Sequence, residues 1–170
     1  MSFGAGLDET TDNYAYTYLL RGATSSNFID AKAGNDYAQV VITPAINITL
    51  TAIYFGFYTS DVSYPEYKCG NFKMAIEYST SPAFTSPVLI LKDLQIGDMS
   101  LNYQMFYNSF PDISMLSGTS YYFRIYFYDE QNTDPLNRVR LDDVYFQVHN
   151  ISGCDMDGDG IMNSVDIDSD

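Results

Sequence analysis

Short runs of alternating apolar and polar residues recur along most of this chain. The clearest run, residues 72–78, places Phe, Met, Ile and Tyr on one face and Lys, Ala and Glu on the other. Alternation with a period of two is typical of a half-buried β-strand. Comparable apolar runs occupy residues 14–20, 37–42, 46–57, 88–91, 101–105, 121–128 and 138–148. No window longer than about ten residues carries a convincing helical period, so the pattern predicts an all-β body.

Two of these runs change phase part-way along. Within residues 46–57 the apolar phase shifts at Ala52 and Ile53, and a bend or β-bulge is the usual cause of such a shift. Within residues 138–148 the shift falls on Asp142 and Asp143. Residues 22–35 and 111–118 are rich in turn-forming types and are expected to be connections. Eight or nine strands of this length predict two antiparallel sheets packed as a sandwich.

The composition changes which partners are expected. The chain carries 22 acidic and 8 basic residues, a formal charge of −14. A surface this acidic repels phosphate backbones, so nucleic acid is not an expected partner. Neither an apolar run of about 18 residues nor a basic amphipathic stretch is present, so membrane insertion is not expected. Residues 1–11 lack the pattern of a signal peptide, and the signal of an exported form would lie upstream.

The last 17 residues, C-D-M-D-G-D-G-I-M-N-S-V-D-I-D-S-D, follow the ligand order of a calcium loop. With Asp155 as position 1, hard oxygen ligands fall at positions 3, 5, 9 and 12, a backbone carbonyl at position 7 and a glycine at position 6. Carboxylates on alternate residues allow a short loop to wrap one Ca²⁺. A solvated acidic tail is the alternative. The expected ligands are Asp155, Asp157, Asp159, Ile161 through its carbonyl, Asn163 and Asp166, with Asp168 as a further candidate.

This stretch resembles the calcium-binding repeat of the thrombospondin type 3 family, on the pattern D-x-D-G-D-G-I-x-N-x-x-D-x-D. We therefore expect two parts: the β-sandwich module predicted from the strand pattern, over residues 1–152, and the start of a calcium repeat, implied by this resemblance, over residues 153–170. Asp168 and Asp170 continue the phase of the repeat, as if a second repeat were beginning. We therefore expect a fragment of a longer protein, whose neighbouring domains are its partners and whose linker is ordered by calcium.

The body resembles the jelly-roll modules of secreted and surface proteins from Bacteroidota-type bacteria, which are related in shape to carbohydrate-binding modules. Segments 42–57, 76–84, 121–128 and 139–144 carry this resemblance, including E-Y-S-T-S-P-A-F and Y-Y-F-R-I-Y-F-Y. It implies a jelly-roll sandwich and a secreted or cell-surface location. The expected function is that of a non-catalytic, calcium-binding module of an adhesin-like protein. The alternative is a carbohydrate-binding module of a larger polysaccharide-active enzyme.

Two further clusters are candidate sites within the body. Asp142 and Asp143 lie where a strand changes phase, and such a position often holds a structural calcium in jelly-roll binding modules; ion pairs with nearby arginines are the alternative. Aromatic rings beside a charged donor on residues 121–128 are candidates for stacking on a sugar or another surface ligand. The alternative there is a strand covered on both faces. The residues of this stripe are Tyr122, Arg124, Tyr126 and Tyr128.

The sequence gives little support for catalysis. His149 is the only histidine, and no G-x-S-x-G motif accompanies it. The glutamates are scattered, and no enzyme activity is expected. Cys69 and Cys154 form either a disulfide, as is common outside the cell, or two free thiols, and both alternatives stay open.

Overall fold

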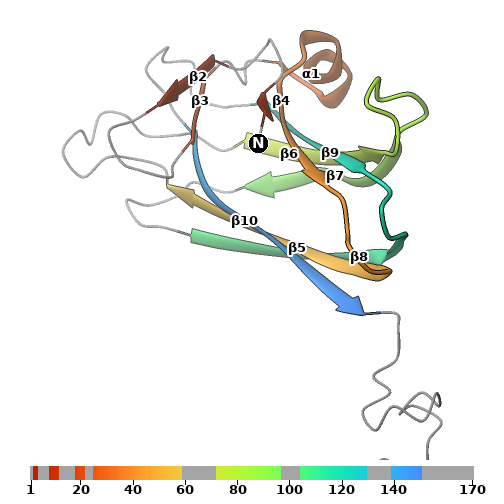
Figure 1. Ribbon diagram of the computed structural model, residues 1–170. Helices are drawn as coiled ribbons and strands as arrows, with labels where there is room; N and C mark the ends of the chain where they lie inside the picture. The colour runs from red at the N-terminus through yellow and green to blue at the C-terminus, as the bar shows by residue number, and fades with distance from the viewer. Residues whose placement is uncertain are drawn as a thin grey trace, which may run out of the picture.

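The computed structural model describes residues 2–3, 8–11, 18–21, 25–58, 72–96, 104–129 and 139–150 of the 170-residue chain. These residues form two layers of strands with one short helix on an outer side (Figure 1). Every paired strand runs antiparallel to its neighbour. The prediction of an antiparallel β-sandwich is confirmed.

Each layer is a five-stranded sheet. Sheet A has the order β1 (Ser2–Phe3), β4 (Tyr37–Ile42), β9 (Tyr121–Tyr128), β6 (Phe72–Ser79) and β7 (Val88–Ile96). Sheet B has the order β2 (Asp8–Thr11), β3 (Tyr18–Arg21), β10 (Val139–Asn150), β5 (Ile48–Tyr58) and β8 (Gln104–Met115). The helix α1 (Phe28–Gly34) precedes β4.

The strand order identifies the type of sandwich. Among the strands from β3 onward, the spatial order is β3-β10-β5-β8 in sheet B and β4-β9-β6-β7 in sheet A. Consecutive strands therefore cross between the two sheets, except where β6 and β7 form a hairpin within sheet A. Eight strands arranged in this way as two Greek keys make a jelly roll, which confirms the predicted jelly-roll sandwich, while the predicted C-terminal calcium loop lies outside the described residues.

The hydrophobic core lies between the two sheets and follows the alternation seen in the sequence. Along β9 every second side chain points inward, because successive side chains of a strand point to opposite faces. Strand β6 beside β9 and strand β5 in the opposite sheet supply large apolar side chains that are completely or almost completely buried. The core residues of these three strands are Leu50, Ile53, Phe55, Phe72, Met74, Ile76, Tyr121, Phe123, Ile125 and Phe127.

The phase shift near Asp142 has a structural cause. Strand β10 advances three residues from Leu141 to Val144, while its partner β5 advances two, from Phe57 to Phe55. One additional residue is therefore accommodated within 142–143, and such a bulge moves the following side chains to the opposite phase. This is why Leu141 and Val144, three residues apart, both contact the core.

The other predicted phase shift also coincides with a bulge. Gln147 and Val148 are consecutive in β10, yet they pair with Ala52 and Leu50 of β5. Thr51 is the additional residue, so the predicted bend or bulge near Ala52 is confirmed.

Two expected connections contain regular structure instead. Residues 111–118 were expected to be a connection, but β8 continues through Pro111 to Met115. Strand β8 pairs only with β5 and is an edge strand of sheet B. Proline lacks a backbone N–H and is tolerated at edges and bulges, and Pro111 lies where the β5–β8 register shifts, between Ser109 and Ile113.

The expected loop 22–35 contains the helix α1. At its start the Asn27 side chain accepts a hydrogen bond from the Asp30 N–H, and at its end Asn35 adopts the left-handed conformation, with φ of 62°. These caps satisfy terminal backbone groups of a helix too short to show a hydrophobic period. Strand β7 also differs from the expected buried strand, because Val88 and Leu89 are about half exposed at the edge of sheet A.

Candidate functional site

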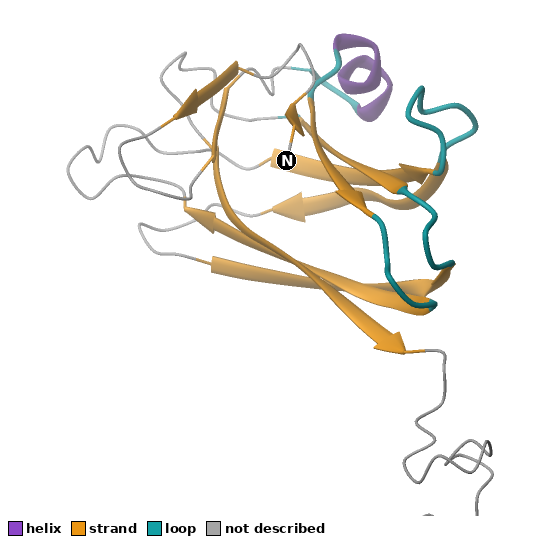
Figure 2. Ribbon diagram, in the orientation of Figure 1, coloured by secondary structure: helices purple, strands orange, loops and turns teal. Residues whose placement is uncertain are grey.

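The predicted stripe on β9 lies on the outer face of sheet A, and its two ends have different surroundings. Tyr126 and Tyr128 are 0% and 1% exposed. The helix α1 covers them: the Phe28 ring meets Tyr126 edge-on at 5.2 Å, and buried Ala31 packs in the same cluster. Figure 2 shows α1 on the side of the sandwich away from β5 and β8. At these two tyrosines the strand is covered on both faces, which is the structural alternative to a ligand surface.

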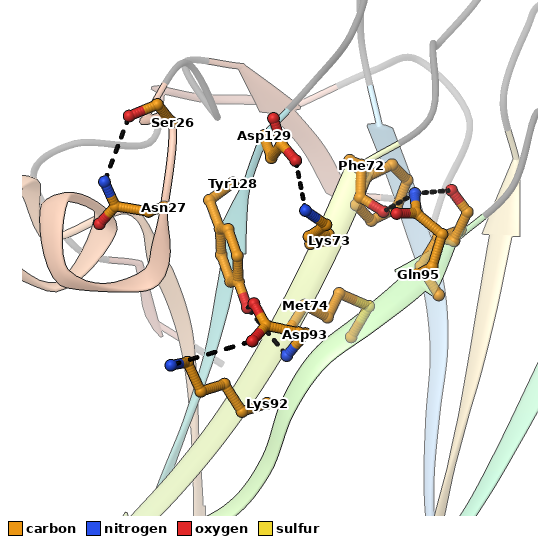
Figure 3. A network of polar contacts seen from close by, with 11 residues as sticks. Ser26, Asn27, Phe72, Lys73, Met74, Lys92, Asp93, Gln95, Tyr128 and Asp129 are labelled. Atoms are coloured by element: carbon orange, nitrogen blue, oxygen red, sulfur yellow. Dashed lines mark hydrogen bonds and ion pairs between the residues drawn. The ribbon is translucent and has the colours of Figure 1, made fainter.

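Polar contacts complete the environment of Tyr128 (Figure 3). Its hydroxyl accepts a hydrogen bond from the Asp93 backbone N–H at 3.0 Å and donates to the Asp93 carboxylate at 2.9 Å. Asp93 adopts a positive φ of 56°, which brings its backbone and side chain to the same hydroxyl. Burial raises the pKa of Tyr128 to about 12, and the negative charge of Asp93 acts in the same direction. This tyrosine therefore has a structural role that ties β9 to β7.

Tyr126 is equally buried, but its hydroxyl lacks such partners. It lies near Glu77 and Arg124 without forming a hydrogen bond of ordinary geometry. Burial raises the pKa of Tyr126 to about 12, and the charge of Glu77 adds to the shift. Glu77 is 4% exposed, and its Oε1 forms an ion pair with Lys32 Nζ of α1 at 2.7 Å. The other carboxylate oxygen, Oε2, has no hydrogen-bond partner. Two unpaired oxygens therefore lie beneath the helix.

Arg124 occupies the more accessible half of the stripe and is held rigidly. Its guanidinium carbon lies 4.2 Å from the centre of the Tyr37 ring and 4.0 Å from that of Phe84. Its Nε donates to Gln39 Oε1 at 3.0 Å. In the described part of the chain, no carboxylate lies within ion-pair distance of Arg124. Arg124 and half-buried Tyr122 are thus the part of the predicted stripe that remains open to solvent.

The predicted calcium ligands Asp155, Asp157, Asp159, Ile161, Asn163, Asp166 and Asp168 lie outside the described residues, as do Cys69 and Cys154. The backbone of Asp142 and Asp143 forms the bulge of β10, but their side chains, like that of His149, are outside the description. Within the described ranges, no three His, Cys, Asp or Glu side chains gather as a metal site would require. Both calcium sites stay predictions.

The structure also brings together three residues that the sequence did not single out. Tyr54 pairs in register with Tyr145 of β10 on one side and with Tyr107 of β8 on the other. These three side chains, here called the tyrosine row, lie on the outer face of sheet B. Tyr54 alternates with the core residues Ile53 and Phe55 of β5, and Tyr145 alternates with Val144 and Phe146 of β10, which pack against the core. The sequence signal for this row is an aromatic residue at an outward, normally polar position in each of three strands. The strand register is what shows that the three tyrosines are neighbours.

Comparisons with known proteins leave the function open. No protein-family model matches the chain, and no curated protein matches it. Among solved structures, it is similar to a Cry1Da tryptic core variant from Bacillus thuringiensis, with 12% identity and a TM-score of 0.49 over 88% of this chain and 22% of the other. It is also similar to the GH26-CBM35 β-(1,4)-mannanase of Podospora anserina, with 11% identity and a TM-score of 0.42 over 87% of this chain and 26% of the other.

The chain thus spans about a quarter or less of the length of these two proteins. Similarities this distant add nothing about a ligand, and the jelly-roll assignment rests on the strand order itself. Of the helices in the described ranges, none is long and apolar enough to cross a membrane.

Proposed function

We propose that this chain is a non-catalytic, calcium-binding module of a secreted or cell-surface, adhesin-like protein. The observation that carries the proposal is the spacing of oxygen donors after β10. Asp155, Asp157, Asp159 and Asp166 occupy positions 1, 3, 5 and 12 of a calcium loop, with Gly160 at the turn. Hard oxygen donors suit Ca²⁺, and the donor set contains no sulfur or imidazole ligand that would favour a transition metal.

The sandwich supports the proposal by fixing one end of this stretch. Strand β10 is hydrogen-bonded on both sides, to β3 and β5, and it ends at Asn150. The acidic stretch follows within a few residues. Clustered carboxylates repel one another without a cation, and binding of Ca²⁺ would offset this repulsion and order the link to neighbouring domains. Asp168 would then share in a second ion with residues farther along a longer chain.

Calcium titration calorimetry on residues 1–170 tests this function. We expect binding with a dissociation constant on the order of 10⁻⁴ to 10⁻³ M, typical of extracellular modules. The double variant Asp157→Asn, Asp159→Asn should abolish it, and the matched variant Asp142→Asn, Asp143→Asn should leave it unchanged. Absence of binding by the intact chain would refute the proposal. Loss of binding only in the second variant would move the ion to the bulge of β10.

A carbohydrate-binding module of a larger polysaccharide-active enzyme is the alternative function. The aromatic stripe on β9 gives this alternative little support, because α1 buries Tyr126 and Tyr128. Of this stripe, Tyr122 and Arg124 remain accessible to a ligand. A glycan would therefore need a different surface of the sandwich.

A further inference from the structure

The tyrosine row crosses three adjacent strands of sheet B, from β10 through β5 to the edge strand β8. Neighbouring strands are about 4.8 Å apart, so the backbones of Tyr145 and Tyr107 lie about 10 Å apart, with Tyr54 between them. The Tyr54 and Tyr107 rings are in contact, with centroids 4.7 Å apart and planes inclined by 44°. This arrangement places three aromatic rings on adjacent strands, over a span longer than a single sugar ring.

The two outer rings are open to solvent although they are large. Tyr107 is 55% exposed and Tyr145 is 53% exposed. The described helix α1 lies against β9 of the other sheet and does not cover this face. Tyrosine side chains combine an apolar ring with a polar tip and lose little conformational entropy on binding. Such rings are suited to a partner that is itself both flat and hydrogen-bonding.

The central ring is positioned before any ligand arrives. The Tyr54 hydroxyl donates to Gln147 Oε1 at 3.2 Å, and Thr51 Oγ1 donates to the Gln147 backbone carbonyl at 3.3 Å. Gln147 lies two residues after Tyr145 on the same face of β10. The carboxamide nitrogen of Gln147 has no hydrogen-bond partner in the described part of the chain. It is therefore available as a hydrogen-bond donor beside the rings. Ordering the ring and the amide in advance lowers the entropy cost of binding.

Small side chains beside the central ring keep this part of the surface low. Ala52 and Gly56 flank Tyr54 along β5, so no long side chain of that strand rises beside its ring. Ser109 pairs with Ala52 on one side, and Gln147 pairs with it on the other. Asp142 and Asp143, the bulge residues of β10, lie opposite Gly56 in the pairing with β5, and the chain as a whole carries −14. An anionic polymer would therefore be repelled from this part of the sheet.

From these observations we propose that the tyrosine row is a binding site for an uncharged polysaccharide, whose sugar rings lie on Tyr107, Tyr54 and Tyr145. The rings take the apolar faces of the sugars, while the Gln147 amide and the tyrosine hydroxyls exchange hydrogen bonds with sugar hydroxyls. Tyrosine is also enriched at protein interfaces, so a protein partner is one of the outcomes that the test below separates from a polysaccharide. This site shares no residue with the calcium stretch and does not depend on the proposed calcium binding.

Affinity gel electrophoresis of the whole chain tests the site. The gels contain galactomannan, xylan, mixed-linkage β-glucan or dextran as neutral polysaccharides, polygalacturonate as an anionic one, and gelatin as a protein. Each is run with calcium and with chelator, so that a failure of the calcium proposal is seen separately. We expect retardation by at least one neutral polysaccharide, weakened about tenfold or more by Tyr107→Ala and by Tyr145→Ala.

Two variants serve as controls. Tyr107→Phe keeps the ring and should retain most of the binding, whereas Leu89→Ala shortens an exposed side chain on β7 of the opposite sheet and should not change it. Thermal unfolding of every variant checks that the exposed substitutions leave the fold intact. The proposal is overturned by the absence of retardation in all neutral gels, by retardation that Tyr107→Ala and Tyr145→Ala leave unchanged, or by retardation only with polygalacturonate or gelatin.

Discussion

Tyr126 and Tyr128 provide a sharp test of how buried hydroxyl groups affect this fold. The two residues lie on the same face of β9, and burial raises the pKa of each to about 12. They differ in the partners of their hydroxyls: Tyr128 exchanges hydrogen bonds with Asp93, whereas Tyr126 has no partner. We expect Tyr126→Phe to stabilise the protein and Tyr128→Phe to destabilise it.

The expected magnitudes follow from these contacts. A buried polar group without a partner costs about 1–3 kcal/mol, and an apolar replacement of the same shape recovers part of this cost. Tyr126→Phe leaves the ring contacts with Phe28 and Tyr37 in place, so it should raise the free energy of unfolding by about 1 kcal/mol. Tyr128→Phe removes a hydrogen bond to a carboxylate that is itself about half exposed. Its cost should be about 1–2 kcal/mol.

Chemical denaturation followed by far-UV circular dichroism measures both changes, with the wild-type chain as reference. In thermal scans, a change of 1 kcal/mol in a chain of this size corresponds to about 2–4 °C. The comparison is well controlled, because both variants remove one oxygen from the same strand. If Tyr126→Phe destabilised the protein as much as Tyr128→Phe, its hydroxyl would have a partner, and the argument from an unpaired oxygen would be wrong.

Two further predictions concern pH and an ion pair. Because the pKa of Tyr126 and of Tyr128 is raised in the folded state, stability should be level below pH about 10 and fall as the pH rises toward 12. Alkaline denaturation curves of the two phenylalanine variants should show a shallower fall, and an unchanged slope in both would contradict this. Lys32→Ala leaves the buried Glu77 carboxylate without its cation and should cost about 1–3 kcal/mol. The exposed pair of Lys92 with Asp93, at 3.8 Å, serves as the comparison: Lys92→Ala should cost less than about 0.5 kcal/mol in the same denaturation assay.

Much of the strand pattern could be predicted from the sequence because burial on one face leaves a direct record. The ranges of β4 and β9 match their predicted limits, and both phase shifts coincide with irregular pairing. Pro111 misled the prediction, since proline favours a turn unless the strand is at an edge, and edge position is a property of the whole sheet. The helix α1 was missed because its caps, rather than a hydrophobic period, define it.

The candidate sites show a different limit. The stripe Tyr122–Tyr128 could be assigned to one face of a strand, but α1 decides which of its rings meet solvent. The tyrosine row could not be found from sequence alone, because Tyr54, Tyr107 and Tyr145 become neighbours only through the pairing of three strands distant in the chain. The calcium stretch is the opposite case, since all of its expected ligands are local in sequence.

The position of β10 in the middle of sheet B has a consequence for the order in which the protein can fold. This strand is the last of the jelly roll along the chain, yet it joins β3 to β5. Until residues 139–150 have left the ribosome, β3 and β5 each keep an unpaired edge, and such edges invite association with other chains. Contacts between segments so far apart also make folding slow. The strand order therefore delays the closure of sheet B until the final strand of the jelly roll is available.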